Sequence, residues 1–194
     1  MQFYPFSAML ARMKYISRWG LMRSSRTESL CEHTADTALL AHTLALISVS
    51  IYGTQVRCET VCVAALYHDA SEILTGDMPT PIKYDNPDIQ SAYKQVEAVA
   101  EQKLLNMLPE DLRPAYDEAL TISDPQVRAL VKAADKLSAY LKCVEEVKAG
   151  NNEFKKAKEQ TYAALCQNQI PALRYFMDRF LDGFELTLDE LSEE

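Results

Sequence analysis

The stretch AALYHDASEILTGDMPTP, residues 64–81, combines an apolar run, a His-Asp pair and a turn rich in proline. The spacing of the apolar residues predicts a helix from about Glu59 to Leu74, with Gly76 as a left-handed cap. A buried charge costs several kcal/mol unless it is paired or binds a metal. His68 and Asp69, which directly follow the apolar run, therefore require a partner.

Glu72 extends this pair to three groups on one face of the expected helix. At about 100° per residue, His68 lies at 0°, Glu72 at about 40° and Asp69 at about 100°. An imidazole and a carboxylate together suit a divalent metal, and a further carboxylate can take a proton from bound water. A helix-end histidine beside two surface acids shows the same pattern, so both interpretations stay open at this point.

Two other histidines, His33 and His42, are available to complete such a site. Both lie on a helix that is expected to begin at a capping box at Ser29 and to stop near Gly53. Their spacing places them about half a turn out of phase, so at most one of them faces a metal. His33 lies in the first turn near the mouth of the helix, whereas His42 lies within an apolar run, where a packed histidine is the usual explanation.

A later helix offers one further acid. The segment Ser123-Asp124-Pro125 is typical of a helix start, and this helix is expected to run to about Lys148. Asp135 lies at the edge of its apolar stripe, flanked by Lys132 and Lys136. A solvated acid that pairs with lysine and a member of the metal cluster are both consistent with this position.

The rest of the sequence also shows helical spacing rather than the alternation typical of strands. Further helices are expected over residues 6–17, 88–107, 152–166 and 172–180. Three prolines within residues 77–87 predict an extended loop. Because no repeat, low-complexity tract or glycine-rich linker divides the chain, we predict one compact all-α helical bundle over residues 1–194.

Composition narrows the classes of function. No apolar run approaches the ~20 residues that span a bilayer, and a net charge of −8 argues against binding a nucleic acid polymer. The five cysteines are odd in number and form no CxxC pair, which favours reduced thiols in the cytoplasm. Cys58 and Cys62 lie one helical turn apart and could share a metal, although packing in the core is the commoner role of such residues.

The first 27 residues differ in charge from the rest of the chain. They carry five basic residues and no acid, so the remainder holds a net charge of −13. An anionic small molecule could dock near this segment, which contains Arg18 and Trp19. An arginine-rich start without acids is also typical of a transit peptide, although Trp19, Gly20 and the interleaved apolar residues suit the start of a fold equally well. The simplest interpretation of the pair is a surface arginine beside a core tryptophan.

Taken in order, Glu32-His33, His68-Asp69 and Asp135 resemble the H…HD…D signature of the HD-domain superfamily of metal-dependent phosphohydrolases. The chain is also similar to the YfbR-type bacterial 5′-deoxynucleotidases over nearly its whole length, through the segments ISRWGLMR, RTESLCEH, YHDASEILTGDMPTPIKY, KAADKLSAYLKC, EEVKAGNNEF and FELTLDEL. The stretch between Pro109 and Ser123 is slightly shorter than the family pattern.

This resemblance implies a role for each matching residue. The implied ligands of one divalent ion, cobalt, manganese or a similar transition metal, are His33, His68, Asp69 and Asp135. Glu72 would assist a metal-bound water as nucleophile, and Arg18 would clamp the phosphate during catalysis. The implied contacts with substrate are Arg18, Trp19, His33, Asp69, Asp77, Met78, Pro79, Thr80 and Asp135.

The resemblance implies an enzyme that hydrolyses 2′-deoxynucleoside 5′-monophosphates to deoxynucleosides and phosphate, as a cytoplasmic homodimer. Trp19 would disfavour ribonucleotides, because a 2′-hydroxyl pressed against it loses water without gaining a partner, at roughly 1–3 kcal/mol. Two other functions stay open: another HD hydrolase, acting on deoxynucleoside triphosphates or cyclic nucleotides, and a non-catalytic module that binds metal or nucleotide. The single compact basic segment argues against the first, and Glu72 argues against the second.

Overall fold

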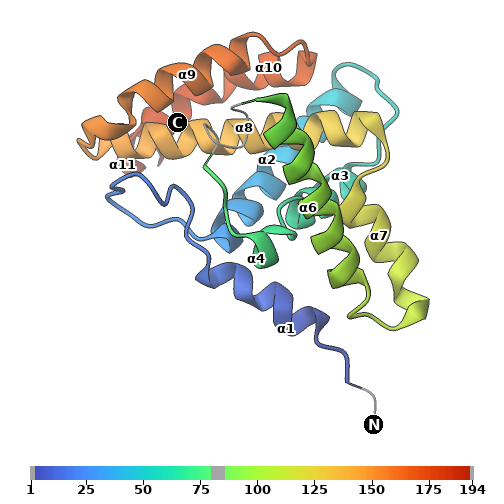
Figure 1. Cartoon of the computed structure of the whole chain (residues 1–194). Coiled ribbons are helices and arrows are strands. Elements are labelled where there is room, and N and C mark those ends of the chain that lie inside the picture. The colour runs from blue at the N-terminus through green and yellow to red at the C-terminus, as the bar shows by residue number, and fades with distance from the viewer. Residues whose placement is uncertain (1–2, 80–85, 193–194) are drawn as a thin grey trace.

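The computed structural model describes residues 3–79 and 86–192 (Figure 1). The helices and 3₁₀ turns of this part are α1 Phe6–Leu10, η1 Ala11–Tyr15, α2 Leu30–Ser50, α3 Cys58–Tyr67, α4 Glu72–Thr75, α6 Pro87–Leu105, η2 Glu110–Leu112, α7 Arg113–Thr121, α8 Pro125–Lys148, η3 Asn152–Phe154, α9 Lys155–Cys166, α10 Pro171–Arg179, η4 Leu181–Glu185 and α11 Leu188–Ser192. Extended segments pair among these residues at an isolated antiparallel bridge between Ser17 and Ser29. The predicted all-α fold is confirmed.

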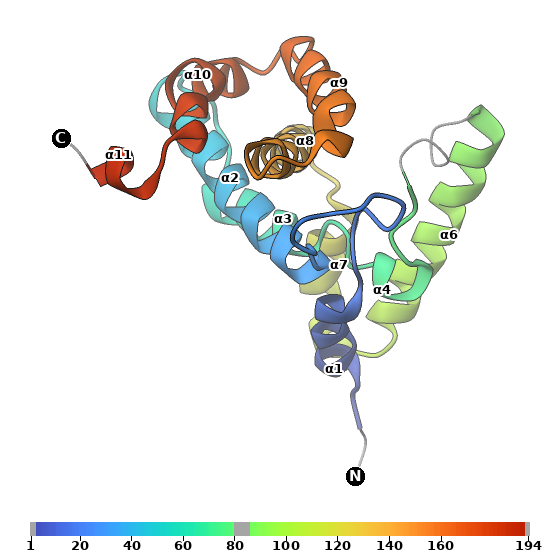
Figure 2. The same ribbon diagram turned by 90° about the vertical axis from the view of Figure 1, so that its left-hand side faces the viewer.

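The larger apolar core surrounds α8. Leu44 of α2, Val61 of α3 and Leu137 of α8 are fully buried in it. Figure 2 looks nearly along α8 and shows α2, α9 and α10 arranged around it. Burying one such side chain contributes roughly 1.5–3 kcal/mol, so this core fixes α2 and α8 against each other. Cys58 and Cys62 pack against the same core, in agreement with the packing role.

A smaller apolar cluster joins α1, α6 and α7. Its buried members include Phe6, Leu104 and Leu120, and the ring of Phe6 meets that of Tyr116 edge-on at 4.7 Å. The basic first segment is therefore part of the fold. Figure 2 shows α1, α4 and α6 on the far side of the molecule from α9 and α10. The chain passes from the larger to the smaller cluster at residues 68–71, between α3 and α4.

The two helix starts that were predicted from capping residues are confirmed. At the start of α2, the Ser29 hydroxyl accepts a hydrogen bond from the Glu32 N–H, and the Glu32 carboxylate accepts one from the Ser29 N–H. This reciprocal capping box satisfies two N–H groups that would otherwise lack partners. At the start of α8, an Asp124 carboxylate oxygen accepts bonds from the Gln126 and Val127 N–H groups, and Pro125 occupies the first turn.

The prediction of one helix from Glu59 to Leu74 is wrong in part, because α3 ends at Tyr67. The Ala70 N–H bonds to the Tyr67 carbonyl at 2.9 Å, and the Glu72 N–H bonds to the Asp69 carbonyl at 3.0 Å. Each bond spans three residues, so the chain winds more tightly here than an α-helix, and the helical angles expected for the His-Asp pair do not hold. Gly76 follows α4 with a positive φ of 77°, but its ψ of 160° lies outside the left-handed region, so the predicted left-handed cap is not formed.

The first helix and the region before α8 also differ from the prediction. The first helix is split into a short α-helix and a 3₁₀ turn that ends at Tyr15, rather than continuing to Ser17. The helix α7 was not among the predicted elements, and it begins with proline in its first turn. No helix in the described ranges combines the length and the apolar character that crossing a bilayer requires.

Candidate active site

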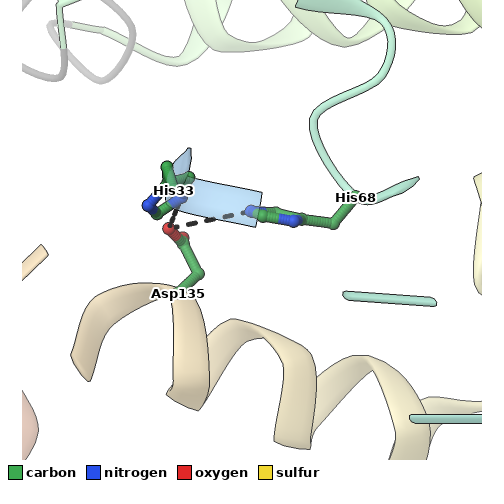
Figure 3. Close-up of side chains that lie close together, drawn as sticks. All are labelled: His33, His68 and Asp135. Carbon is green, nitrogen blue, oxygen red and sulfur yellow. Dashed lines mark ion pairs between the residues drawn. The ribbon is translucent and has the colours of Figure 1, made fainter. Parts of the chain in front are cut away.

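His33, His68 and Asp135 come from three separate elements and point toward one another (Figure 3). One ligand atom from each lies within 4.8 Å of the other two. Asp135 Oδ1 is 3.1 Å from His33 Nε2 and 3.9 Å from His68 Nε2. The His33 side chain is 0% exposed and that of Asp135 is 42% exposed, so this cluster opens to the surface on the side of Asp135.

The start of α2 explains why His33, rather than His42, belongs to the cluster. The capping box fixes the first helical residue at Leu30, and the His33 N–H donates to the Ser29 carbonyl at 3.1 Å. This places the His33 ring 5.4 Å from the His68 ring. His42 is half-buried further along the same helix and is not a member of the cluster.

The second ring nitrogen of each histidine has its own partner. His68 Nδ1 lies 2.7 Å from the Ala65 carbonyl, and because a carbonyl can only accept, Nδ1 carries the hydrogen. His33 Nδ1 lies 3.2 Å from the hydroxyl of Ser138. Such partners orient the ring so that Nε2 can act as a ligand. Ser138 was not among the predicted site residues, although it follows Asp135 by one helical turn, which is the signal that could have identified it.

The two Nε2 atoms test whether these residues suit a metal. Both are buried, and neither has a hydrogen-bond partner among the described residues, although carboxylate oxygens lie nearby. Imidazole nitrogens and carboxylate oxygens that face a common point are the donors that divalent transition ions prefer. The donor set of His33, His68 and Asp135 therefore fits a metal ion.

Asp69 lies next to the cluster rather than within it. Its Oδ2 atom is 3.2 Å from His68 Nε2, 3.5 Å from His33 Nε2 and 3.4 Å from Arg18 Nη1. Asp69 is not in the group whose ligand atoms all lie within 4.8 Å of one another. The structure thus brings all four predicted ligands close together, and one of them also contacts the arginine.

The charges at this site favour a positive charge at its centre. Burial alone would raise the pKa of Asp135, but its contacts with His33 and His68 outweigh burial and hold the pKa well below the ordinary value. Burial alone would lower the pKa of His68, but Asp69 and Asp135 outweigh burial and raise it well above the ordinary value. A cation that replaces the protons would be held by the same two carboxylates.

Arg18 is not a surface arginine, since its side chain is 12% exposed. Burial lowers the pKa of Arg18, but the charges of nearby carboxylates outweigh burial and raise it; in order of effect they belong to Asp69, Asp135, Glu28 and Asp77. Arg18 therefore stays charged beside the cluster of His33, His68 and Asp135. A charged guanidinium next to a cation site can hold an anion whose oxygens reach both.

Trp19 lies beside Arg18 and has a φ of 59°, in the left-handed region. Its Nε1 donates a hydrogen bond to Glu28 Oε2 at 3.0 Å, and its ring centre is 5.3 Å from that of Phe154. Neither Glu28 nor Phe154 was among the site residues predicted from the sequence. Glu28 immediately precedes the capping box, whereas nothing in the sequence signals the contact with Phe154.

The remaining predicted residues lie after the turn that carries His68. Glu72 opens α4 and is 4% exposed. Asp77, Met78 and Pro79 follow Gly76 in a half-buried segment without regular secondary structure. Thr80 lies outside the described residues, as does most of the proline-rich loop.

Known proteins are similar to this chain over nearly its whole length. The sequence pattern of a family described as 5′-deoxynucleotidase YfbR-like matches residues 5–184. A 5′-deoxynucleotidase of Vibrio vulnificus is 50% identical over 196 residues, covering 99% of this chain and 100% of that protein. The 5′-deoxynucleotidase YfbR of Shigella dysenteriae is 48% identical over 193 residues, covering 97% of this chain and 96% of that protein.

A solved structure supports the fold independently. An HD-domain phosphohydrolase of Listeria innocua has a TM-score of 0.80 at 21% identity, covering 92% of this chain and 87% of that chain. At this identity the likeness concerns the fold alone, whereas the sequence relatives match from end to end. The chain therefore belongs to the family of YfbR-like 5′-deoxynucleotidases.

Proposed function

We propose that this chain is a metal-dependent phosphomonoesterase that hydrolyses 2′-deoxynucleoside 5′-monophosphates to deoxynucleosides and phosphate. The observation that carries the proposal is the convergence of His33, His68 and Asp135, with two buried Nε2 atoms that face carboxylate oxygens at 3.1 and 3.2 Å, beside a charged Arg18. Relatives that are about half identical over their whole length are named 5′-deoxynucleotidases. Hydrolysis of deoxynucleoside 5′-monophosphates is therefore the reaction that best accounts for the cluster of His33, His68 and Asp135.

One divalent ion would be held by His33, His68 and Asp135, and we propose Asp69 as the fourth ligand. Its Oδ2 lies within 3.5 Å of both histidine Nε2 atoms, which supports this assignment. When bound, such an ion acidifies water and offsets negative charge on the phosphoryl group. Cobalt, manganese or a similar transition metal suits a mixed set of nitrogen and oxygen ligands.

The side chains around the cluster would divide the remaining work. Arg18 would hold the phosphate, because its flat fork of N–H donors matches two phosphate oxygens. Glu72 would take the proton from the attacking water. Trp19 would lie against the sugar and disfavour a 2′-hydroxyl, and the segment from Asp77 to Thr80 would line the nucleotide.

Release of phosphate from 2′-deoxyadenosine 5′-monophosphate (dAMP) tests this function. We expect turnover with added Mn²⁺ or Co²⁺, loss of turnover after chelation, and recovery when the ion is restored. Deoxyadenosine triphosphate and cyclic adenosine monophosphate should be poor substrates. Preferred cleavage of either one would assign the chain to a different class of HD hydrolase, and binding of dAMP without any turnover would indicate a non-catalytic module.

We further propose that the chain acts as a homodimer in the cytoplasm. The odd number of cysteines, none of them in a CxxC pair, supports a reducing compartment. Leu39 and Leu46 lie seven residues apart on α2, so they share one face, and they are 70% and 44% exposed. Sedimentation should give twice the 21.9 kDa of one chain, and Leu39→Glu should lower this mass. A wild-type protein that sediments as a monomer at micromolar concentration would contradict the dimer.

A further inference from the structure

Glu28 makes two contacts that the proposed roles of Arg18 and Trp19 do not explain. Its Oε2 atom accepts hydrogen bonds from Arg18 Nε at 3.1 Å and from Trp19 Nε1 at 3.0 Å. The side chains of Glu28 and Arg18 are 11% and 12% exposed, so their bond is shielded from solvent. One carboxylate oxygen therefore orients both side chains.

The backbone holds Glu28 opposite this pair. The Arg18 N–H donates to the Glu28 carbonyl at 2.9 Å, and the neighbouring Ser17 and Ser29 form the antiparallel bridge. Trp19 has a positive φ, which a bulky residue rarely adopts unless its surroundings impose it. Glu28 imposes this φ on Trp19 through two hydrogen bonds, one from the Arg18 N–H to its carbonyl and one from the Trp19 indole to its carboxylate.

Glu28 also orients the guanidinium of Arg18, so that one particular edge faces the cluster of proposed metal ligands. Because Glu28 binds the Nε side of Arg18, the Nη1 side is turned toward Asp69, at 3.4 Å. If Glu28 is removed, Asp69 is left as an ion-pair partner of Arg18. The guanidinium is then expected to turn fully toward Asp69, which weakens its hold on a phosphate.

We propose that Glu28 is a positioning residue that couples phosphate binding to sugar discrimination, through Arg18 and Trp19. The inference rests on the proposed function for the roles of those two residues. It follows that one substitution at Glu28 changes both the turnover of dAMP and the preference for dAMP over adenosine 5′-monophosphate (AMP). A general loss of stability does not alter the ratio between two substrates.

Fluorescence tests the contact without relying on activity, because Trp19 is the only tryptophan of the chain. Glu28→Ala removes the bond to Nε1, so acrylamide should quench the emission of Trp19 more strongly than in the wild type. Glu28→Gln keeps an oxygen that can accept this bond, and its quenching should lie between the two. If Glu28→Ala does not fold, Glu28→Gln provides the same comparison.

Kinetics test the coupling. Loss of a residue that orients a functional side chain typically costs 10–100-fold in activity, and we expect a loss of this size in kcat/KM for dAMP in Glu28→Ala. The ratio of kcat/KM for dAMP to that for AMP should fall as well. In a double-mutant cycle, the turnover loss should largely vanish in an Arg18→Ala background, and the change in ratio should vanish in a Trp19→Ala background.

Two results would overturn the role of Glu28. The first is quenching of Trp19 that is unchanged in both Glu28 variants. The second is a turnover loss from Glu28→Ala that stays equally large in the Arg18→Ala and Trp19→Ala backgrounds. Failure of the proposed function looks different, since a wild type that releases no phosphate from dAMP leaves the quenching comparison intact.

Discussion

Glu72→Gln is expected to lower kcat for dAMP by about 10²–10⁴-fold while the protein keeps its metal. Hydrolysis of phosphate monoesters is among the slowest uncatalysed reactions, so the proton of the attacking water must be removed by a positioned group. Glu72 is a buried carboxylate that opens α4, directly after the turn that carries His68 and Asp69. Glutamine preserves its shape but cannot accept this proton.

Two quantities should be measured together, namely kcat from phosphate release and the metal-to-protein ratio from elemental analysis. Asp135→Ala is the comparison for a lost ligand, and we expect it to reduce both quantities. Glu59→Gln is the matched control, because Glu59 is an exposed glutamate on the neighbouring α3, and it should behave as the wild type. If Glu72→Gln loses metal as Asp135→Ala does, Glu72 is a ligand rather than a base, and if its kcat is unchanged, it has neither role.

Local patterns predicted the helices well where the ends are chemically marked. Ser29 with Glu32, and Asp124 with Pro125, carry the capping groups that helix starts require, and both helices begin where these residues predict. The end of α3 carries no such mark. No glycine or proline lies between His68 and Ser71, so the pattern continues as a helix, whereas the chain turns from one apolar cluster to the other. That turn depends on packing between segments that are distant in sequence. The spacing of apolar residues along the chain gives no information about such packing.

For the candidate site too, the sequence indicated single residues but not the contacts between residues far apart in the chain. Helical spacing alone marked His68 as a candidate and limited the second histidine to one of two, but it did not link Asp135 to either. That link came from the resemblance to a family, and the structure brings the three side chains together. Glu28 and Ser138 lie within segments that resemble the family, but the sequence does not assign their contacts, because the partners Arg18 and His33 are 10 and 105 residues away.

Glu146→Ala is expected to lower the free energy of unfolding by about 3–5 kcal/mol at neutral pH. Glu146 and Lys142 form an ion pair on α8 with side chains that are 1% and 5% exposed. Removing the acid leaves a buried ammonium without its charged partner. It also removes the acceptor for the Ser25 N–H, at 2.8 Å, and for the Asn151 side-chain amide, at 2.8 Å.

The pH dependence follows from the same contacts. Burial alone would raise the pKa of Glu146, but the bonds from Lys142, Ser25 and Asn151 outweigh it and lower the pKa. A carboxylate with a lowered pKa in the folded state adds stability that is complete above its unfolded pKa, about 4.3, and is lost as the pH falls through the folded pKa. The difference in stability between the wild type and Glu146→Ala should therefore be largest near pH 7 and shrink below about pH 4.

Urea unfolding measures this difference, and Glu145→Ala is the matched control on the adjacent, exposed residue. We expect less than about 0.5 kcal/mol from the control. Equal stability of the two variants would mean that the buried pair contributes nothing.

Loss of this pair should also affect the active site, because Glu146 and Lys142 bind the backbone of Ser25 and Arg26 in the segment that leads back from Trp19 to α2. Glu146→Ala should therefore raise KM for dAMP at urea concentrations below the unfolding transition. Glu145→Ala should leave this KM unchanged, because Glu145 is exposed.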